Sequence, residues 1–405
     1  MKRILISTFF LIAISANNLF ACTTAVVSGK YTKDGRPILW KHRDSDFNDN
    51  KLMYFTDGKY NYIGLVNSED IKGEQVWGGT NSTGFSIMNA ALFDVNLDYN
   101  GDYRDREGYV MKMALQQCSS LEDFEDFLNN LQIPKGVAAS FGVIDAKGGA
   151  AYYETDNNRF VKFDANDPRV APNGYLVRTN FAFTGEKDKG YGYIRYESAQ
   201  DLFANAFATN NLNYQTIITD FSRSFYHSLL KTDYRKLAEN SSDKQTFVNS
   251  GDLICRNGSV SAIVIHGVKK GEAPEFTTMW TVIGFPFTAV AVPTWVKGGK
   301  NLPKMLIAEK NGKAPLCDAI LKLKDQCYPI NRSSGYKYLN VTALVNNENT
   351  GILQKIEPIE QNIFQKTEKE LSNWRINLME KDKIQTYYKW MNNYVMKEYK
   401  TILEN

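Results

Sequence analysis

The sequence predicts an α+β protein in which two antiparallel sheets pack against each other between outer layers of helices. Strand-like segments fall into two groups, and helical segments at about 106–131 and 196–240 separate them. Turn residues between neighbouring strands favour hairpins, which make the sheets antiparallel. Two stacked antiparallel sheets with helices outside give four layers, an αββα sandwich.

The first hairpin is expected to begin at residue 22. The run Cys-Thr-Thr-Ala-Val-Val is typical of a strand, Lys33-Asp34-Gly35-Arg36 is a turn signal, and Pro37-Ile38-Leu39-Trp40-Lys41 resumes as a second strand. The hairpin ends in the charged segment 41–46. Further strands of this group are expected at 52–55, 60–66 and within 75–89.

A helical segment follows, because apolar residues recur at helical spacing between 106 and 131. The second group of strands is expected at 137–145, 149–155, 175–181, 252–266 and 278–284. From Glu357 to Glu404 the chain is charged, aromatic and periodic, which predicts two amphipathic helices packed back on the core. We therefore expect a sandwich domain at 22–345 and C-terminal helices at 346–405.

The segment from Met1 to Ala21 has the pattern of a cleaved secretory signal. Lys2 and Arg3 precede an apolar core, which is too short to span a bilayer, and the segment ends in Ala21. We expect an exported protein, periplasmic or extracellular, whose mature chain begins at Cys22. No later run reaches the roughly 18 apolar residues of a membrane-spanning helix, so no integral membrane segment is expected.

Composition excludes several classes of function. The 48 basic and 45 acidic residues nearly balance, at a formal net charge of +3, which gives no case for nucleic acid as a partner. No HExxH, CxxC, P-loop or GxGxxG pattern occurs, so no metal, nucleotide or other cofactor is expected. The expected partner is therefore a small-molecule substrate. The sequence leaves open whether the protein forms a homo-oligomer.

Five cysteines are present, at positions 22, 118, 255, 317 and 327. An odd number in an exported protein predicts one free thiol, and Cys22 is the natural choice. Cys317 and Cys327 are close enough in sequence to close a small disulfide loop, but the pairing of cysteines cannot be deduced from sequence.

Cys22 is the leading candidate for a catalytic residue. As the first residue of a mature chain it carries a thiol and a free α-amine on the same Cα. A thiol is a strong nucleophile, and an α-amine with a pKa of about 7.7–8.0 is a suitable base near neutral pH. The pair needs no third residue to bring it together, and this is the design of an N-terminal-nucleophile (Ntn) hydrolase.

Two other interpretations of Cys22 exist. Leu19-Phe20-Ala21-Cys22 loosely resembles a bacterial lipobox, which would make Cys22 the lipid anchor of a non-catalytic surface lipoprotein. A papain-type Cys/His pair would need one of only three histidines, among which His42 is nearest to the hairpin end. His227 and His266 lie in aromatic or apolar segments that favour packing roles.

Three residues near the hairpin complete a site with Cys22. Two antiparallel strands of similar length bring Arg43 and Asp46 back beside the cysteine. A guanidinium there favours the thiolate, and a carboxylate orients the amine. Asn81 lies in a Gly-Gly-Thr-Asn turn, where a side-chain amide beside a backbone N–H can form an oxyanion hole, although Asn-x-x-Gly is also an ordinary hairpin turn.

These residues, in this order, resemble the choloylglycine hydrolase and penicillin V acylase superfamily. The Cys-Thr-Thr-Ala-Val-Val opening and the segment 280–295 are more similar to its isopenicillin-N acyltransferase and linear-amide hydrolase group. The resemblance spans roughly 22–296. It implies an Ntn αββα fold, with Cys22 as nucleophile, Arg43 and Asp46 beside it and Asn81 in the oxyanion hole. It further implies that Asn180 polarises the carbonyl or anchors the amine, and that Arg256 completes the polar cluster.

The sequence therefore predicts an exported amidohydrolase that cleaves linear, non-peptide C–N bonds of N-acyl amides through a Cys22 thioester. If an amine or thiol replaces water as the acceptor, the same site is an acyltransferase. Bile-salt conjugates, phenoxyacyl penicillins, N-acyl amino acids and β-alanyl amines all remain open as substrates.

Overall fold

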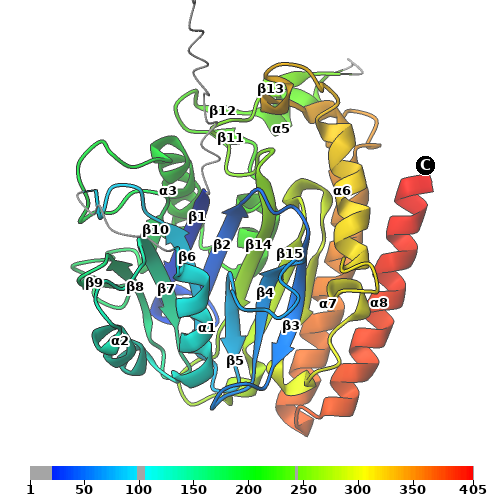
Figure 1. Cartoon of the computed structure of the whole chain (residues 1–405). Helices are drawn as coiled ribbons and strands as arrows, with labels where there is room; N and C mark the ends of the chain where they lie inside the picture. Colours follow the sequence, from blue (N-terminus) through cyan, green and yellow to red (C-terminus); the bar gives the residue numbers. More distant parts are fainter. Residues whose placement is uncertain (1–20, 98–104, 242–244, 405) are drawn as a thin grey trace, which may run out of the picture.

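The computed structural model describes residues 21–97, 105–241 and 245–404, and the predicted signal segment before Ala21 lies outside them. Two antiparallel sheets form the centre of the fold, as predicted (Figure 1). The first sheet has six strands, in the order β10 (Tyr175–Arg178), β1 (Cys22–Val27), β2 (Ile38–Asp44), β14 (Ser259–His266), β15 (Thr278–Ile283) and β16 (Ala291–Thr294).

The second sheet has seven strands in simple sequence order. They are β3 (Asn50–Phe55), β4 (Tyr62–Asn67), β5 (Gly79–Asn81), β6 (Ser86–Ala91), β7 (Ala139–Ile144), β8 (Ala150–Thr155) and β9 (Phe160–Asp164). Two small hairpin-like pairs lie outside the sandwich, β11 (Tyr226–His227) with β12 (Thr232–Asp233), and β13 (Phe247–Asn249) with β17 (Tyr338–Asn340).

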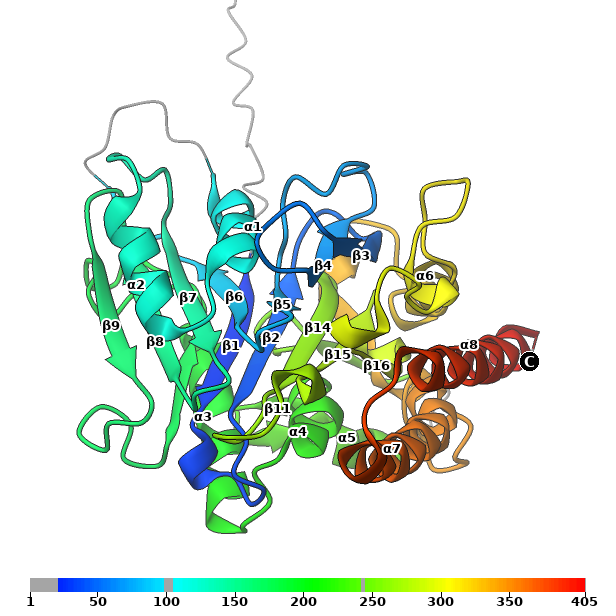
Figure 2. The same ribbon diagram turned by 90° about the horizontal axis from the view of Figure 1, so that it is seen from below.

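Helices cover the outer face of each sheet, so the predicted four-layer order is confirmed (Figure 2). Over the seven-stranded sheet lie α1 (Glu107–Gln117) and α2 (Leu121–Asn130). Over the six-stranded sheet lie α3 (Tyr193–Ala208), α4 (Tyr214–Thr216) with the π-helical turn Ile217–Phe221, α6 (Pro315–Cys327), α7 (Ile352–Asn377) and α8 (Lys381–Glu404), while α5 (Tyr234–Glu239) packs beside them.

Two details differ from the prediction. The segment 106–131 is two helices, because the Ser120 side chain accepts a hydrogen bond from the Asp123 N–H and starts a new helix there. The segment 196–240 is interrupted by the β11–β12 pair. Its turn is closed by the Lys231 N–H bonded to the Ser228 carbonyl, with Lys231 at a φ of 49°, and a helix cannot continue through that conformation.

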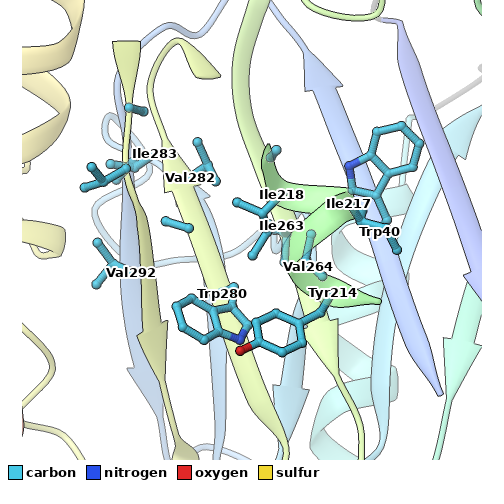
Figure 3. Close-up of a cluster of buried hydrophobic side chains, with 14 of the residues drawn as sticks. Trp40, Tyr214, Ile217, Ile218, Ile263, Val264, Trp280, Val282, Ile283 and Val292 are labelled. Carbon is cyan, nitrogen blue, oxygen red and sulfur yellow. The ribbon is translucent and has the colours of Figure 1, made fainter. Parts of the chain in front are cut away.

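One large apolar cluster covers the helix side of the six-stranded sheet, and a second lies between the seven-stranded sheet and helices α1 and α2. Trp40 of β2 and Trp280 of β15 lie in the first cluster among aliphatic side chains of β14, β15 and β16 (Figure 3). The ring of Tyr214 stacks on Trp280, and the indole N–H of Trp40 donates to Ser222 Oγ at 2.9 Å. Since alternate residues of a strand face opposite ways, the residues next to Trp40 along β2 face the other sheet.

The two predicted C-terminal helices are present, and they pack on the edge of the six-stranded sheet. Glu360 of α7 accepts two hydrogen bonds from the Arg223 guanidinium, each 2.6 Å long, and a third from the N–H of Ala291 in β16. Tyr399 of α8 donates to the Thr288 carbonyl at 2.8 Å. The predicted boundary between a sandwich domain at 22–345 and a C-terminal part at 346–405 stays a prediction. No helix in the described ranges is long and apolar enough to cross a membrane.

The disulfide between Cys317 and Cys327 that the sequence left open is not formed in the structure. All five are free and buried in the structure. Cys317 and Cys327 lie near opposite ends of helix α6, where a separation of ten residues corresponds to roughly 15 Å. That distance is far beyond the reach of a disulfide bond.

Candidate active site

The β1–β2 hairpin brings Cys22 opposite Arg43. In the register of the two strands Cys22 pairs with Arg43 and Thr24 with Lys41. Directly paired residues of antiparallel strands share a face. The Thr24 hydroxyl accepts a hydrogen bond from Tyr152 of β8, so this face is the one that meets the second sheet. The thiol, the guanidinium and the Lys41 ammonium therefore enter the space between the sheets.

Strand β1 begins and β2 ends at the same end of the sandwich (Figure 1). Residues at this end line a pocket of about 290 Å³. Cys22, Lys41 and Arg43 line one side of it together with Trp77 and Asn89. The opposite wall is apolar, and carboxylates complete the lining. These remaining residues are Ala91, Leu92, Phe93, Val95 and Ala138, with Asp44, Asn96, Asp105 and Glu107.

Asn180 lies where the sequence predicted it, against the main chain of Cys22. Its Oδ1 accepts a hydrogen bond from the Cys22 N–H at 3.0 Å, and its Nδ2 donates to the Ala91 carbonyl at 2.9 Å. The residue is fully buried just beyond the end of β10, next to β1 in the sheet. The amide therefore has one fixed orientation, with its oxygen toward the nitrogen of Cys22.

Arg195 of helix α3 is a site residue that the sequence did not reveal. Its guanidinium donates to the Cys22 carbonyl at 2.6 Å, to Thr23 Oγ1 at 2.9 Å and to Asn180 Oδ1 at 2.8 Å. Burial lowers the pKa of Arg195 to about 9, so the group still carries its charge at neutral pH. It ties the first two residues of β1 to Asn180.

Lys41 and Asn89 form a second pair that the sequence did not reveal. The Lys41 ammonium donates to Asn89 Oδ1 at 2.6 Å and to the Trp77 carbonyl at 2.8 Å. Burial lowers the pKa of Lys41 to about 8, so the cation predominates at pH 7. Because Lys41 occupies the oxygen of the Asn89 amide, the Nδ2 donors of Asn89 are the part of that side chain left for a ligand. The structure records no hydrogen bond from this Nδ2 to any described residue.

Arg43 lines the pocket, as the sequence predicted, and it is held there by neutral acceptors. Nη1 donates to Asn50 Oδ1 at 2.8 Å, while Nη2 donates to Asn67 Oδ1 at 3.0 Å and to Ser45 Oγ at 3.3 Å. The guanidinium also lies over the Trp77 ring, 4.8 Å from its centroid. Burial lowers the pKa of Arg43 to about 10, which leaves it charged at neutral pH.

Asp44 at the end of β2 lines the pocket, whereas Asp46 is exposed to solvent. Strand β2 ends at Asp44, so the chain has left the sheet before it reaches Asp46. Asp44 accepts hydrogen bonds from Arg256 Nε at 2.8 Å and from Ser259 Oγ at 2.7 Å. Burial acts against the charged form, but Arg256 keeps the pKa of Asp44 below its usual value. Arg256 thus reaches the cluster through Asp44.

Asn81 lies away from Cys22, at the far end of β5, and it does not line the pocket. Both of its Nδ2 donors are used, on the carbonyls of Leu115 and Cys118 at the C-terminus of helix α1, at 2.9 and 2.8 Å. Its Oδ1 accepts from the N–H and hydroxyl of Thr83. The expected oxyanion role is therefore not available to this side chain, which caps a helix and closes a turn instead.

His42 faces away from the thiol. It pairs with Thr23 in the hairpin, on the opposite face from Cys22, and its Nε2 bonds to Ser259 Oγ at 2.8 Å. Burial lowers the pKa of His42 to about 4, so the ring is neutral near pH 7. This placement does not fit the papain-type alternative. In the described part of the chain no cluster of His, Cys, Asp or Glu is arranged to hold a metal ion.

Comparison with known proteins gave matches only among solved structures. No family model matches the chain. No curated protein sequence matches it either. An N-acylethanolamine-hydrolyzing acid amidase ortholog from Caenorhabditis elegans shares 15% identity over 47% of this chain and 86% of that chain, with a TM-score of 0.35.

Two other solved structures are similar over larger parts of the chain. A mutant conjugated bile acid hydrolase from Clostridium perfringens shares 12% identity over 68% of this chain and 92% of that chain, with a TM-score of 0.38. Penicillin V acylase from Agrobacterium tumefaciens shares 10% identity over 69% of this chain and 87% of that chain, with a TM-score of 0.37.

Proposed function

We propose that the mature protein is an exported Ntn amidohydrolase that cleaves a linear C–N amide bond with Cys22. The single observation that carries the proposal is the placement of Cys22, which lines the pocket while Asn180 holds its main-chain nitrogen in one orientation. After removal of the segment up to Ala21, that nitrogen becomes an α-amine, a suitable base near neutral pH.

In the proposed reaction the amine takes the thiol proton, and the sulfur attacks the amide carbonyl carbon. The resulting oxyanion accepts hydrogen bonds from Asn89 Nδ2, the role that the sequence assigned to Asn81. Collapse of the tetrahedral intermediate breaks the C–N bond, and the ammonium of Cys22 returns its proton to the leaving nitrogen. Water, activated by the same amine, then hydrolyses the thioester.

The surrounding residues have positioning roles in this proposal. Asn180 orients the amine, and Arg195 fixes Asn180 through the bond to its Oδ1. Arg43, opposite Cys22, supports the thiolate. Asp44 takes the place expected for Asp46, with Arg256 as its partner, and holds the end of β2 beside Cys22.

The burial of Cys22 does not fit the lipid-anchor alternative. Its side chain is 6% exposed, and its nitrogen is bonded to a fully buried Asn180. A lipoprotein anchor needs both groups free to carry acyl chains outside the domain. Transfer of the acyl group to an amine instead of water uses the same thioester, so an added amine acceptor distinguishes acyl transfer from hydrolysis by its product.

The proposal is tested by the mature protein and its Cys22→Ser variant. We expect an intact mass that corresponds to a chain beginning at an unmodified Cys22, and hydrolysis of at least one member of a panel of N-acyl amides. The Ser variant should have the same fold and an activity lower by orders of magnitude. A lipid-modified Cys22, or a Ser variant as active as the parent, would contradict the proposal.

A further inference from the structure

Two buried cations in the pocket have no carboxylate partner among the residues that the structure describes. Lys41 and Arg43 are only 1% and 3% exposed, and they lie two residues apart on the same face of β2. Neither makes an ion pair with a carboxylate of the described residues; their hydrogen bonds go to the neutral acceptors given above. Buried charges in proteins are normally paired, so this arrangement points to an anion that the pocket receives.

The three carboxylates in the pocket lining have other positions or partners. Asp44 is held by Arg256. Glu107 accepts a hydrogen bond from the Ala138 N–H at 2.8 Å. Asp105 is exposed at the start of helix α1, where it acts on the cations only at a distance. None of the three replaces a direct partner for Lys41.

The Cys22 sulfur acts on both cations, but Arg43 is the one placed directly beside it. Arg43 is the residue directly opposite Cys22, whereas Lys41 pairs with Thr24, two residues and roughly 7 Å further along the strand. An ammonium has three donors, and Lys41 uses two of them on Trp77 and Asn89. One donor and one charge therefore remain beyond the reacting sulfur.

The orientation of Cys22 indicates which half of a substrate would meet Lys41. The nitrogen of Cys22 is directed toward Asn180, on the β10 side of β1, and the leaving amine must lie on that side to receive its proton. The acyl group then extends over β2, toward Lys41. The wall it would follow includes Leu92 and Phe93, which suits methylene groups. A volume of about 290 Å³ suits a short chain.

We propose that the pocket selects an acyl group that ends in a carboxylate, of the glutaryl or succinyl type, and that Lys41 pairs with this carboxylate. The proposal rests on the proposed function, because it assigns the acyl side of the same reaction. It makes Lys41 a specificity-determining residue, whereas Arg43 serves the sulfur.

The test compares two amides of aminomethylcoumarin that have the same leaving group and the same number of acyl carbons. One carries a glutaryl group and the other a pentanoyl group, so they differ only in the terminal carboxylate. We expect the wild-type kcat/KM for the glutaryl amide to exceed that for the pentanoyl amide by at least about tenfold. In Lys41→Met, which removes the charge at similar length, this ratio should fall to near one.

Lys51→Met is the matched control, because Lys51 is also buried but bonds to the Ser68 carbonyl and does not line the pocket. This variant should keep the ratio of the wild type. A wild-type ratio near one would overturn the proposal. So would a Lys41→Met variant in which both amides lose activity equally, since Lys41 would then serve the reaction and not the acyl group.

Binding of glutarate, measured by calorimetry, gives a second readout that needs no catalysis. We expect wild type to bind glutarate at least about tenfold more tightly than Lys41→Met does. Neutral glutaramide should bind to wild type no more tightly than it binds to Lys41→Met. Lys41-dependent binding without hydrolysis of either amide would uphold the anion pocket and contradict the proposed function. No glutarate binding to wild type would overturn the anion pocket whatever the hydrolysis result.

Discussion

The Oδ1 of Asn180 accepts the N–H of Cys22 at 3.0 Å, although the two residues are 158 positions apart in the sequence. The bond is possible because β10 is the sheet neighbour of β1 on the side opposite β2. Arg195 binds the same oxygen at 2.8 Å from helix α3, so two elements converge on the nitrogen of Cys22. This nitrogen is the proposed base, and its orientation decides whether the thiol proton can be transferred.

Replacement of Asn180 by Leu is therefore expected to lower kcat by roughly 10²–10³, the range for loss of one group that orients or stabilises the reacting atoms. KM should change little, because Asn180 does not line the pocket. Steady-state kinetics on any accepted amide provide the measurement. A variant that is folded by circular dichroism and retains its kcat would show that Asn180 only supports the loop.

The oxyanion role is tested by a pair of asparagines. Asn89→Ala should lower kcat by roughly 10²–10³, because its Nδ2 is directed to the ligand in the proposed reaction. It should also lower the free energy of unfolding, because the buried Lys41 ammonium loses an acceptor. Asn81→Ala should leave kcat near that of the wild type and lower the free energy of unfolding by about 1–3 kcal/mol, because the two carbonyls at the end of helix α1 lose their donors. The opposite outcome would restore Asn81 to the site.

The free amine is tested by a variant that keeps one extra residue before Cys22 after export. The thiol is unchanged, but the nitrogen becomes an amide that cannot accept a proton near neutral pH. We expect this variant to be nearly inactive. Full activity in a protein shown by mass to be uncleaved would exclude the amine as the base and leave Cys22 as an ordinary thiol.

The preference for an anionic acyl group should depend on pH in one direction. Lys41 has a pKa lowered to about 8 by burial, so its charge is present below pH 8 and is lost above it. The titratable groups that act on Lys41 are Cys22, Arg43 and Asp105. They are the same for both substrates, so their effect on the reaction cancels in the ratio of the two kcat/KM values. The ratio of kcat/KM for glutaryl over pentanoyl amide should therefore fall as pH rises through about 8, since kcat/KM follows the free enzyme. A flat ratio from pH 6 to roughly pH 10 would contradict this assignment.

The buried pair of Arg223 and Glu360 is expected to anchor the C-terminal helices. Glu360→Gln leaves the Arg223 cation buried without its partner, and should lower the free energy of unfolding by about 3–5 kcal/mol. Chemical denaturation measures the change. Asp318→Asn is the control: it breaks the surface pair with Lys322 on helix α6 and should cost at most about 1 kcal/mol. A small effect of Glu360→Gln would show that apolar contacts alone hold α7.

Local patterns were sufficient for the fold but only for part of the site. The hairpin from Cys22 and the strand before Asn180 follow from turn residues and β-branched runs, and both place their residues correctly. Whether Asp46 reaches the site depends on where β2 ends, and whether Asn81 does depends on which way its side chain faces. Asp44 and Asp46 are two residues apart and would share a face in a longer strand. They differ because β2 ends at Asp44, and the sequence alone does not show where the pairing of the strand stops.

Two of the site residues that were missed, Lys41 and Arg195, differ in how far the sequence could have revealed them. Lys41 is the first charged residue after the apolar start of β2, and in a strand it shares a face with Arg43, which the sequence had already placed beside Cys22. That shared face was the available signal. Arg195 had no such sign, because a single arginine on an aromatic helix is ordinary. Its contact with Cys22 exists only because α3 lies across the end of β1, and that placement is a property of the whole fold.

Ala21, the residue just before Cys22, is only 4% exposed, and its carbonyl accepts the N–H of Asp44 at 2.7 Å. The bond that must be cut to free the amine is therefore covered once β1 lies beside β2. Proteases act on exposed, unpaired chain segments. In the proposed maturation, the segment before Cys22 must therefore be removed while the chain is still unfolded, and a molecule that folds before the cut would keep its base masked as an amide.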